Sequence, residues 1–225
     1  MLVGLALLAA AAGLYAAARQ TSVFAIDRIE VEGLPPGAAA RVRDALEPLA
    51  GTSLVAFGDT DGNRRLATVP LVARASYDRD FPHTLRVTVT AERPLALLRR
   101  GSAAWVVSEN ARVLRRVTTR PLPSLPRIWL PATADPIVGA TMADDSASAV
   151  RALAAIATVA LPVPIRSVRL VGGEVSVTLR SGTEVRFGSA TRLPLKAAVA
   201  ARIIPLAGDA RSIDVSVPER AVTSS

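Results

Sequence analysis

The sequence has no cysteine and a single histidine, His83. Without cysteine, the chain cannot form a disulfide framework, a thiolate nucleophile or a cysteine-built zinc site. His83 follows Pro82 in a predicted hairpin turn, where it has no nucleophile to activate, so we interpret it as a turn residue. These absences exclude chemistry that depends on thiolates or on clustered imidazoles.

Other signals of catalysis are equally scarce. Paired carboxylates such as Asp78 with Asp80 and Asp144 with Asp145 fall at predicted strand and helix ends, where capping accounts for them. The pair Gly172-Gly173 lacks the spacing of a phosphate-binding loop or a dinucleotide fingerprint. We therefore predict a protein that is not an enzyme and that binds no metal and no cofactor.

Lysine is nearly absent: Lys196 is the only one, although the formal net charge is +8. Arginine therefore carries most of the positive charge, and the arginines are scattered along the chain instead of forming a block. Aromatic residues make up 4% of the sequence, too few to interleave with arginine for base stacking. The composition thus disfavours a nucleic-acid partner.

The first 18 residues carry no charged side chain. A helix of this length rises about 27 Å, close to the ~30 Å hydrocarbon core of a membrane. Its apolar side chains include Leu2, Leu5, Leu8 and Leu14. We predict a transmembrane helix over residues 1–20 that anchors the chain in the cytoplasmic membrane, with the rest of the chain outside the cytoplasm.

Two other interpretations of this segment stay open. Residues 16–18 are alanines and meet the small-residue requirement of signal-peptide cleavage. Against cleavage, the segment has no basic n-region, and its apolar run is longer than a typical h-region. A buried helix of a soluble domain is disfavoured because the run is apolar on every face.

Residues 21–92 are predicted to form a compact α+β module. Ile29 and Val31 alternate with charged residues, as in a half-buried strand, and Val42 and Leu46 lie on one face of a helix. A short second helix follows, and then a hairpin that turns at residues 81–83. The predicted order is strand, helix, helix, strand, strand, over residues 28–32, 42–49, 61–68, 73–78 and 85–90.

Residues 93–217 are predicted to form a mixed β domain with two helices, followed by a C-terminal tail over residues 218–225. The boundary between the two modules is Glu92-Arg93-Pro94. The five prolines of residues 121–136 predict an extended loop that buries Ile128 and Trp129. The predicted elements are a hairpin over 105–117, a helix over 144–161, a three-stranded meander over 168–187, a helix over 192–204 and a last strand over 213–217.

Four segments of the sequence resemble the FtsQ/DivIB family of bacterial cell-division proteins. They are residues 24–33 (FAIDRIEVEG), 71–75 (LVARA), 80–96, which begin DFPHTLRVTV and end ERPLA, and 212–217 (SIDVSV). The last segment is similar to the family's closing I-D-L-R strand, with Ser216 where the arginine usually stands. The resemblance covers nearly the whole chain after residue 20.

This resemblance implies a POTRA module at residues 24–92 and the family's β domain at residues 93–217. It also implies a divisome scaffold at the division septum, whose β domain binds partners resembling FtsB and FtsL through its C-terminal edge strand. A sheet edge can bind a partner strand because its backbone N–H and C=O groups are unpaired. The predicted partner-binding residues are Ser212, Ile213, Asp214, Val215, Ser216 and Val217.

Alternatives to this hypothesis remain at two levels. At the level of residues, Ile213, Val215 and Val217 could be core side chains, in which case the backbone would carry the binding. At the level of function, a POTRA-containing component of outer-membrane assembly or secretion would have tandem copies or a β-barrel. A secreted binding protein released by signal cleavage is the other rival.

Overall fold

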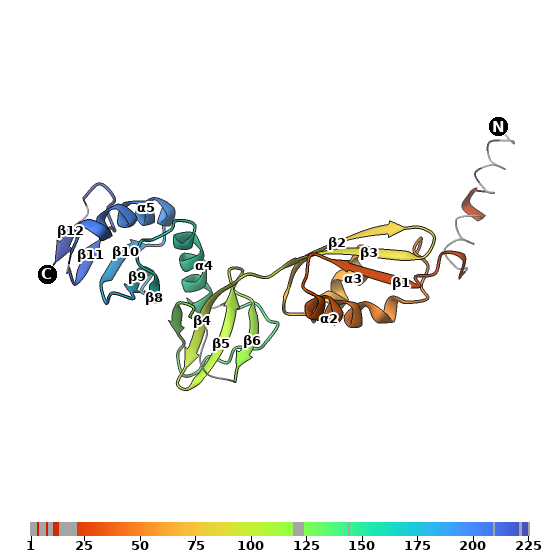
Figure 1. Ribbon diagram of the computed structural model, residues 1–225, viewed down its shortest axis with the longest axis horizontal. Helices are drawn as coiled ribbons and strands as arrows, with labels where there is room; N and C mark the ends of the chain where they lie inside the picture. The colour runs from red at the N-terminus through yellow and green to blue at the C-terminus, as the bar shows by residue number, and fades with distance from the viewer. Residues whose placement is uncertain are drawn as a thin grey trace. The chain divides into compact units, whose positions relative to one another are not determined.

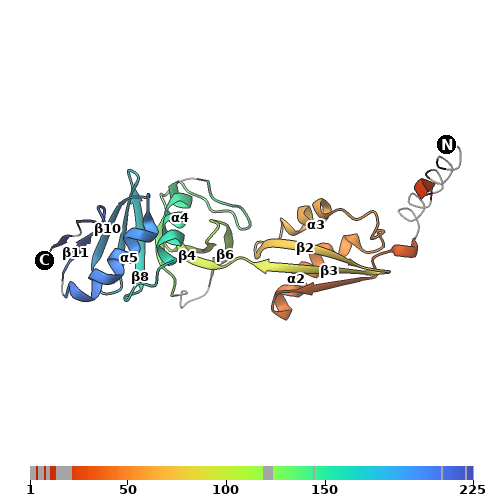
Figure 2. The same cartoon turned by 90° about the horizontal axis from the view of Figure 1, so that it is seen from above.

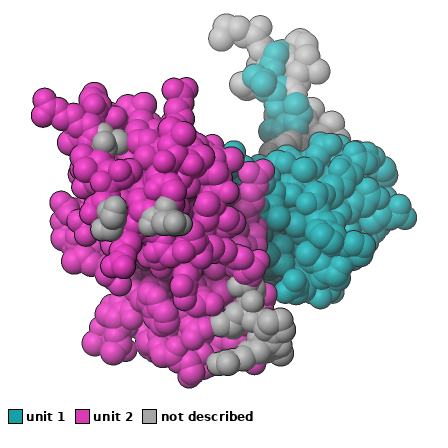
Figure 3. All heavy atoms as spheres, turned by 60° about the vertical axis from the view of Figure 1, so that its left-hand side comes forward, with its two compact units in different colours: residues 1–91 teal, residues 92–225 magenta. Residues whose placement is uncertain are grey.

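The computed structural model describes residues 22–118, 124–143, 145–208, 210–220 and 222–224, together with residues 4, 8 and 11–13. The chain divides into two compact units, Met1–Ala91 and Glu92–Ser225 (Figure 3). We call them unit 1 and unit 2 and describe each by itself.

Unit 1 has the predicted order of strand, helix, helix, strand and strand, so the α+β prediction is confirmed here (Figure 1). One turn of 3-10 helix precedes β1, and another follows α2. The elements are η1 (Ser22–Phe24), β1 (Arg28–Glu32), α2 (Pro36–Leu46), η2 (Glu47–Leu49), α3 (Asp59–Leu66), β2 (Val72–Asp80) and β3 (Thr84–Ala91).

The three strands of unit 1 form one sheet in the order β1-β3-β2. β1 runs parallel to β3, with Ile29 opposite Leu85, and β2 runs antiparallel to β3. Leu85 and Val87 point to one face, where they pack with Val42 of α2 and Leu66 of α3 in a single core. Both helices therefore cover the same face of the sheet, and the other face stays open to solvent.

The contact between α3 and β2 depends on a glycine. A Cβ added at Gly62 would lie 2.5 Å from Cζ of Tyr77, so only glycine fits between the helix and this ring. The Tyr77 ring packs edge-on against Phe57, and its hydroxyl donates a hydrogen bond to Asn63 Oδ1 at 3.1 Å. Burial, with the negative charge of Asp59 as the second cause, raises the pKa of Tyr77 to about 12.

Unit 2 combines nine strands with two α-helices in the residues that the structure describes. Its elements are β4 (Pro94–Arg100), β5 (Ala103–Ser108), β6 (Val113–Val117), β7 (Arg127–Trp129), α4 (Asp145–Ala157), β8 (Ile165–Val171), β9 (Glu174–Leu179), β10 (Glu184–Ser189), α5 (Leu193–Ile203), η3 (Ile204–Leu206), β11 (Ser212–Asp214) and β12 (Val222–Ser224).

These nine strands form one sheet in the order β12-β11-β10-β9-β8-β7-β4-β5-β6. β7 joins two antiparallel meanders by pairing in parallel with β4 on one side and with β8 on the other. β11 runs parallel to β10, and β12 runs antiparallel to β11. The C-terminal segments therefore build one end of the sheet, as the neighbouring β10 and β11 labels in Figure 2 show.

One apolar core lies between this sheet and the two helices of unit 2. Val150, Leu153 and Ile156 of α4 face the sheet, and Ala197 and Ala200 of α5 do the same further along it. Small alanine side chains let α5 approach both β10 and α4 closely. The strands and helices share one hydrophobic cluster that reaches Ile213 in β11 and Val215 beyond it.

Several sequence expectations for unit 2 need correction. No strand was expected at β4, where Leu97 and Leu98 are both buried, and β7 lies inside the stretch that was expected to be loop. Ile128 is buried as expected, but Trp129 is 57% exposed, with the Arg99 guanidinium 5.7 Å from its ring centroid. α4 ends at Ala157, four residues before the expected end at residue 161.

The predicted transmembrane helix falls largely on residues that are not described. Leu2, Leu5 and Leu14 lie outside the described residues, and Leu8 is exposed. Among the residues that the structure describes, no helix is long and apolar enough to cross a membrane.

Candidate partner-binding edge

The segment predicted to bind partners begins as β11 and leaves the sheet before its expected end. β11 pairs in parallel with β10, with Ile213 opposite Val185. The N–H of Val215, one residue after β11 ends, donates a hydrogen bond to the carbonyl of Arg186 in β10 at 2.9 Å and so extends the pairing of the two segments. Ile213 and Val215 are fully buried in the core, whereas Val217 is 51% exposed.

The prediction that residues 212–217 form the exposed edge is wrong in one respect. β12 pairs with the outer side of β11 and is itself the last strand of the sheet. The chain reverses after Pro218, where the Arg220 N–H donates to the Val217 carbonyl at 2.9 Å, and returns along β11. The segment expected to be a tail thus supplies the edge strand.

A local turn ends β11. Oδ1 of Asp214 accepts a hydrogen bond from the N–H of Ser216 at 2.9 Å, which bends the chain away from β10. Gly188 of β10 has a φ of +63°, and a Cβ there would lie 2.8 Å from Cβ of Ser216. Ser216 therefore packs directly against a glycine that has no room for a side chain.

Lys196 of α5 donates hydrogen bonds to backbone carbonyls of β10, an interaction that the sequence did not predict. The Nζ of this buried lysine donates to the carbonyls of Phe187 at 2.8 Å and Ser189 at 2.9 Å. Burial, followed by the positive charge of Arg192, lowers the pKa of Lys196, and Asp214 opposes this change. Its only sequence signal is that it is the single lysine of an arginine-rich chain.

These contacts connect α5 to the point where the chain leaves β11. The ladder between β9 and β10 shifts between Arg186 and Gly188, which marks a bulge in β10. Lys196 bonds the carbonyls on either side of Gly188, and Gly188 in turn lies against Ser216. The end of β11 is therefore positioned by side chains of the folded core.

The four edge strands of the described sheets differ in charge. β1 carries Arg28, Glu30 and Glu32, and Arg43 of α2 donates to the outer carbonyl of Ile29 at 3.3 Å. β2 also carries four charged side chains. Charged side chains on an edge strand oppose the addition of another strand. Both edges of unit 1 are therefore poor sites for β-augmentation.

The two edges of unit 2 are unlike each other. β6 carries Arg115 and Arg116, and its Val113 exchanges backbone hydrogen bonds with Gly139 and Ala140, which cover part of that edge. β12 consists of valine, threonine and serine. Among the four described edge strands it alone has no charged side chain, so the β12 end of the sheet is the candidate binding edge.

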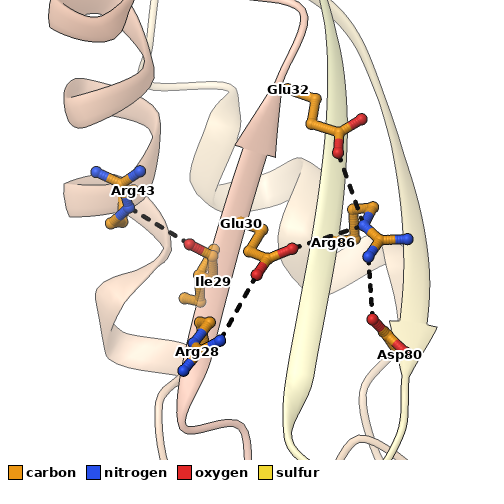
Figure 4. A network of polar contacts seen from close by, with 7 residues as sticks. All are labelled: Arg28, Ile29, Glu30, Glu32, Arg43, Asp80 and Arg86. Carbon is orange, nitrogen blue, oxygen red and sulfur yellow. Dashed lines mark hydrogen bonds and ion pairs between the residues drawn. The ribbon is translucent and has the colours of Figure 1, made fainter.

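The open face of unit 1 carries a network of ion pairs centred on Arg86 (Figure 4). Arg86 donates to Asp80 at 3.0 Å, and its Nε lies 3.7 Å from carboxylate oxygens of both Glu30 and Glu32. These side chains come from three strands and are partly exposed. Their arrangement stabilises the sheet across its strands and does not form a pocket.

The histidine and the carboxylates that the sequence analysis considered as catalytic or metal-binding residues do not gather in one place. Nδ1 of His83 lies 3.1 Å from the Ala25 carbonyl and 3.5 Å from Asp27, at the start of unit 1. Asp80 is engaged by Arg86, and Asp144 lies outside the described residues. Within the described part of the chain, no three histidine, aspartate or glutamate side chains gather to hold a metal ion.

Comparison with known families concerns unit 1. Residues 24–93 match the model of the POTRA domain, FtsQ-type. The match covers the elements from β1 to β3, whose order was predicted from the sequence. No curated protein matches the chain.

Proposed function

Because its FtsQ-type POTRA domain identifies the chain as a member of the FtsQ/DivIB family, we propose that it is a cell-division scaffold that binds partners at the β12 end of its second sheet. The proposed partners resemble FtsB and FtsL. We further propose that residues 1–20 anchor the protein in the cytoplasmic membrane, with units 1 and 2 outside the cytoplasm at the division septum. The scaffold works by binding and performs no catalytic turnover.

The observation that carries this proposal is the uncharged edge strand β12, which pairs with the outer side of β11. In a β-strand, backbone groups point alternately to the two neighbouring strands. Since the N–H of Val215 points to β10, the backbone groups of Asp214 point to β12, where Val222 is its partner, and those of Thr223 point to the unpaired outer side of β12. A partner strand that pairs there gains backbone hydrogen bonds, and its alternate side chains provide specificity.

The core of unit 2 supports this role because it makes the edge rigid. Ile213 and Val215 are buried in the core, so β11, the strand on which β12 pairs, keeps a fixed position. A rigid edge orders fewer groups on binding than a flexible one, which lowers the entropic cost of association.

The proposed function is tested by imaging the full chain, fused to a fluorescent protein, in dividing cells of its own species. A division scaffold should form a band at midcell, and depletion of the protein should produce filamentous cells. A fusion with Ser102→Ala, at an exposed turn position of unit 2 away from the proposed edge, serves as a matched control for expression. Uniform membrane fluorescence together with normal division after depletion would remove the proposal.

A further inference from the structure

The exposed apolar side chains of unit 1 gather at one end of the unit. Of the large apolar side chains described in residues 22–91, the exposed ones are Val23, at 62%, and Phe81, at 52%. Val23 lies in η1, where the chain enters the unit, and Phe81 lies in the turn between β2 and β3, beside that entry (Figure 1). Exposed apolar side chains that lie together mark a site of interaction.

An aromatic contact joins the turn to the entry segment. The rings of Phe24 and Phe81 pack edge to face, with their centroids 5.5 Å apart. Phe24 is half-buried and packs against the core of unit 1, so it connects the exposed ring of Phe81 to the folded interior. We call Val23, Phe24 and Phe81 the apolar tip.

Backbone hydrogen bonds keep the apolar tip in a fixed geometry. The carbonyl of His83, in the turn, accepts hydrogen bonds from the N–H of Asp27 at 2.9 Å and from the N–H of Arg28 at 3.2 Å. β1 then runs parallel to β3, with Arg28 opposite Thr84. The turn and the chain entry are therefore parts of one rigid structure.

The apolar tip follows directly after the segment that we propose as the membrane anchor. Three extended residues measure at most about 11 Å, so Val23 lies no farther than that from residue 20. The headgroup layer on each side of the ~30 Å hydrocarbon core is roughly 5–8 Å thick. An anchor that ends at residue 20 therefore places the tip at the level of the lipid headgroups or just beyond them.

Resting on the membrane anchor proposed above, we propose that the apolar tip inserts into the outer face of the lipid bilayer and gives unit 1 a second membrane contact. Insertion removes the exposed surfaces of Val23 and Phe81 from water. Because the tip is already rigid, few groups have to be ordered when it inserts. Two contacts with the bilayer also prevent unit 1 from rotating freely about its anchor.

The charges beside the tip favour apolar insertion over electrostatic attraction. Asp27 and Arg28 are both well exposed there and carry opposite charges. Asp80, which precedes Phe81, is paired with Arg86 at 3.0 Å. A surface of mixed sign gains little from anionic headgroups. We therefore expect the tip to bind neutral and anionic bilayers alike.

The test uses the full chain in phosphatidylcholine vesicles, with one engineered cysteine labelled with the apolar dye bimane. The chain has no cysteine of its own, so each variant carries the dye at one position. Phe81→Cys places the dye at the tip. Ala91→Cys is the control, at the exposed far end of the eight-residue strand β3, about 23 Å from its start. Lipids brominated near the headgroup quench a dye that enters the bilayer.

We expect the dye at residue 81 to lose at least about half of its fluorescence in brominated vesicles, because an inserted side chain reaches about 5–10 Å into the headgroup and acyl boundary. The dye at residue 91 should be quenched little, and neither phosphatidylglycerol nor high salt should change these results. Equal quenching at the two positions would overturn insertion of the tip. Quenching at residue 81 that high salt removes would also overturn it, because charge would then hold the contact.

A second pair of variants tests the native ring. The dye is placed at Val23→Cys, with and without Phe81→Ser, and circular dichroism verifies that both variants keep the wild-type fold. Phe81→Ser should lower the quenching at residue 23, because it removes the ring that enters the bilayer. Unchanged quenching would show that the anchor alone holds residue 23 at the membrane and would overturn the proposal.

Sedimentation of the vesicles after an alkaline wash reports the anchor independently of the tip. A chain that stays with the vesicles but is not quenched at residue 81 would overturn the tip and leave the proposed anchor standing. A chain that the wash releases would instead remove the anchor from the proposed function, and the apolar tip with it.

Discussion

The two units protect the free edges of their sheets in different ways. Unit 1 carries charged side chains on both edge strands and adds Arg43 over an outer carbonyl of β1. Unit 2 ends at β12, an uncharged strand of three residues. Charged side chains oppose strand pairing, whereas an uncharged edge strand leaves its backbone groups open to a partner strand. The comparison indicates that strand addition is opposed in unit 1 and possible at one end of unit 2.

The polar contacts of the two units also differ in burial. Those of Arg86 in unit 1 are partly exposed, whereas Lys196 in unit 2 is buried against backbone carbonyls. The free energy of a polar contact grows as water is excluded from it, and so does the cost of removing one partner. Trp105 and Trp129, the two tryptophans, both lie in unit 2, so tryptophan fluorescence reports that unit alone.

The largest effect is expected for Lys196→Met. The substitution keeps the length of the side chain but leaves the carbonyls of Phe187 and Ser189 without their donor, at a cost of about 2–3 kcal/mol. Urea unfolding followed by tryptophan fluorescence should show this loss in unit 2. Arg202→Met, on the exposed side of the same helix, is the control and should change stability little. Equal effects of the two substitutions would show that Lys196 does not support β10.

A smaller loss, about 1–2 kcal/mol, is expected in unit 1 for Gly62→Ala. Alanine favours a helix over glycine, but the new methyl group would overlap the Tyr77 ring, and this overlap dominates. The change should appear in circular dichroism and leave the tryptophan transition unchanged. Gly37→Ala is the matched control, because a Cβ at Gly37 meets no atom within 4 Å. A Gly62→Ala protein as stable as the wild type would contradict the close packing of α3 on β2.

Alkaline pH should affect the two units in opposite directions. Between pH 10 and 12 the unfolded chain loses the Tyr77 proton while folded unit 1 keeps it, so the free energy of unfolding of unit 1 falls. Folded unit 2 releases the Lys196 proton before the unfolded chain does so near 10.5, so its free energy of unfolding rises with pH up to that value.

Urea titrations at several pH values, read by fluorescence for unit 2 and by circular dichroism for the whole chain, measure both trends. Tyr77→Phe should flatten the first trend, and Lys196→Met should flatten the second. Trends that persist in these variants would assign them to other groups.

The smallest effect is expected for Arg86→Gln. Partly exposed ion pairs contribute about 1 kcal/mol or less, even in a network, and salt screens them. Unit 1 should lose stability at low ionic strength and recover most of it at high ionic strength. Arg74→Gln provides the comparison, because Arg74, in the same sheet, forms no ion pair within the described residues. A loss that salt does not reduce would assign Arg86 a packing role instead.

The sequence predicted unit 1 well because its signals are local. Ile29 and Val31 alternate with charged residues, and the turn at Pro82 separates two alternating strands, so the order of the elements follows from periodicity and turn residues. The FtsQ-type POTRA match covers this same region. Strand β4 escaped prediction because Leu97 and Leu98 are buried on opposite faces, which removes the alternation that identifies a strand.

The candidate site was predicted only in part, because its decisive contacts are not local. The sequence indicated a strand at Ile213. It did not indicate β12, because this strand has only three residues and no periodicity, and because no sequence motif predicts the chain reversal that lets it pair with β11. The role of Lys196 could not be predicted from its being the only lysine, because a buried lysine is recognised by the carbonyls around it. Such contacts arise from tertiary packing, which periodicity does not describe.

The most direct test of partner binding at the outer edge of β12 compares Thr223→Pro with Thr223→Ala. Both remove the threonine side chain, but only proline removes the outward N–H and places a ring in the path of a partner strand. Tryptophan fluorescence verifies that unit 2 stays folded. We predict that affinity for the FtsB-type segment falls at least about ten-fold, or 1.4 kcal/mol, for proline, and stays near that of the wild type for alanine. Binding of the proline variant with wild-type affinity would contradict strand addition at this edge.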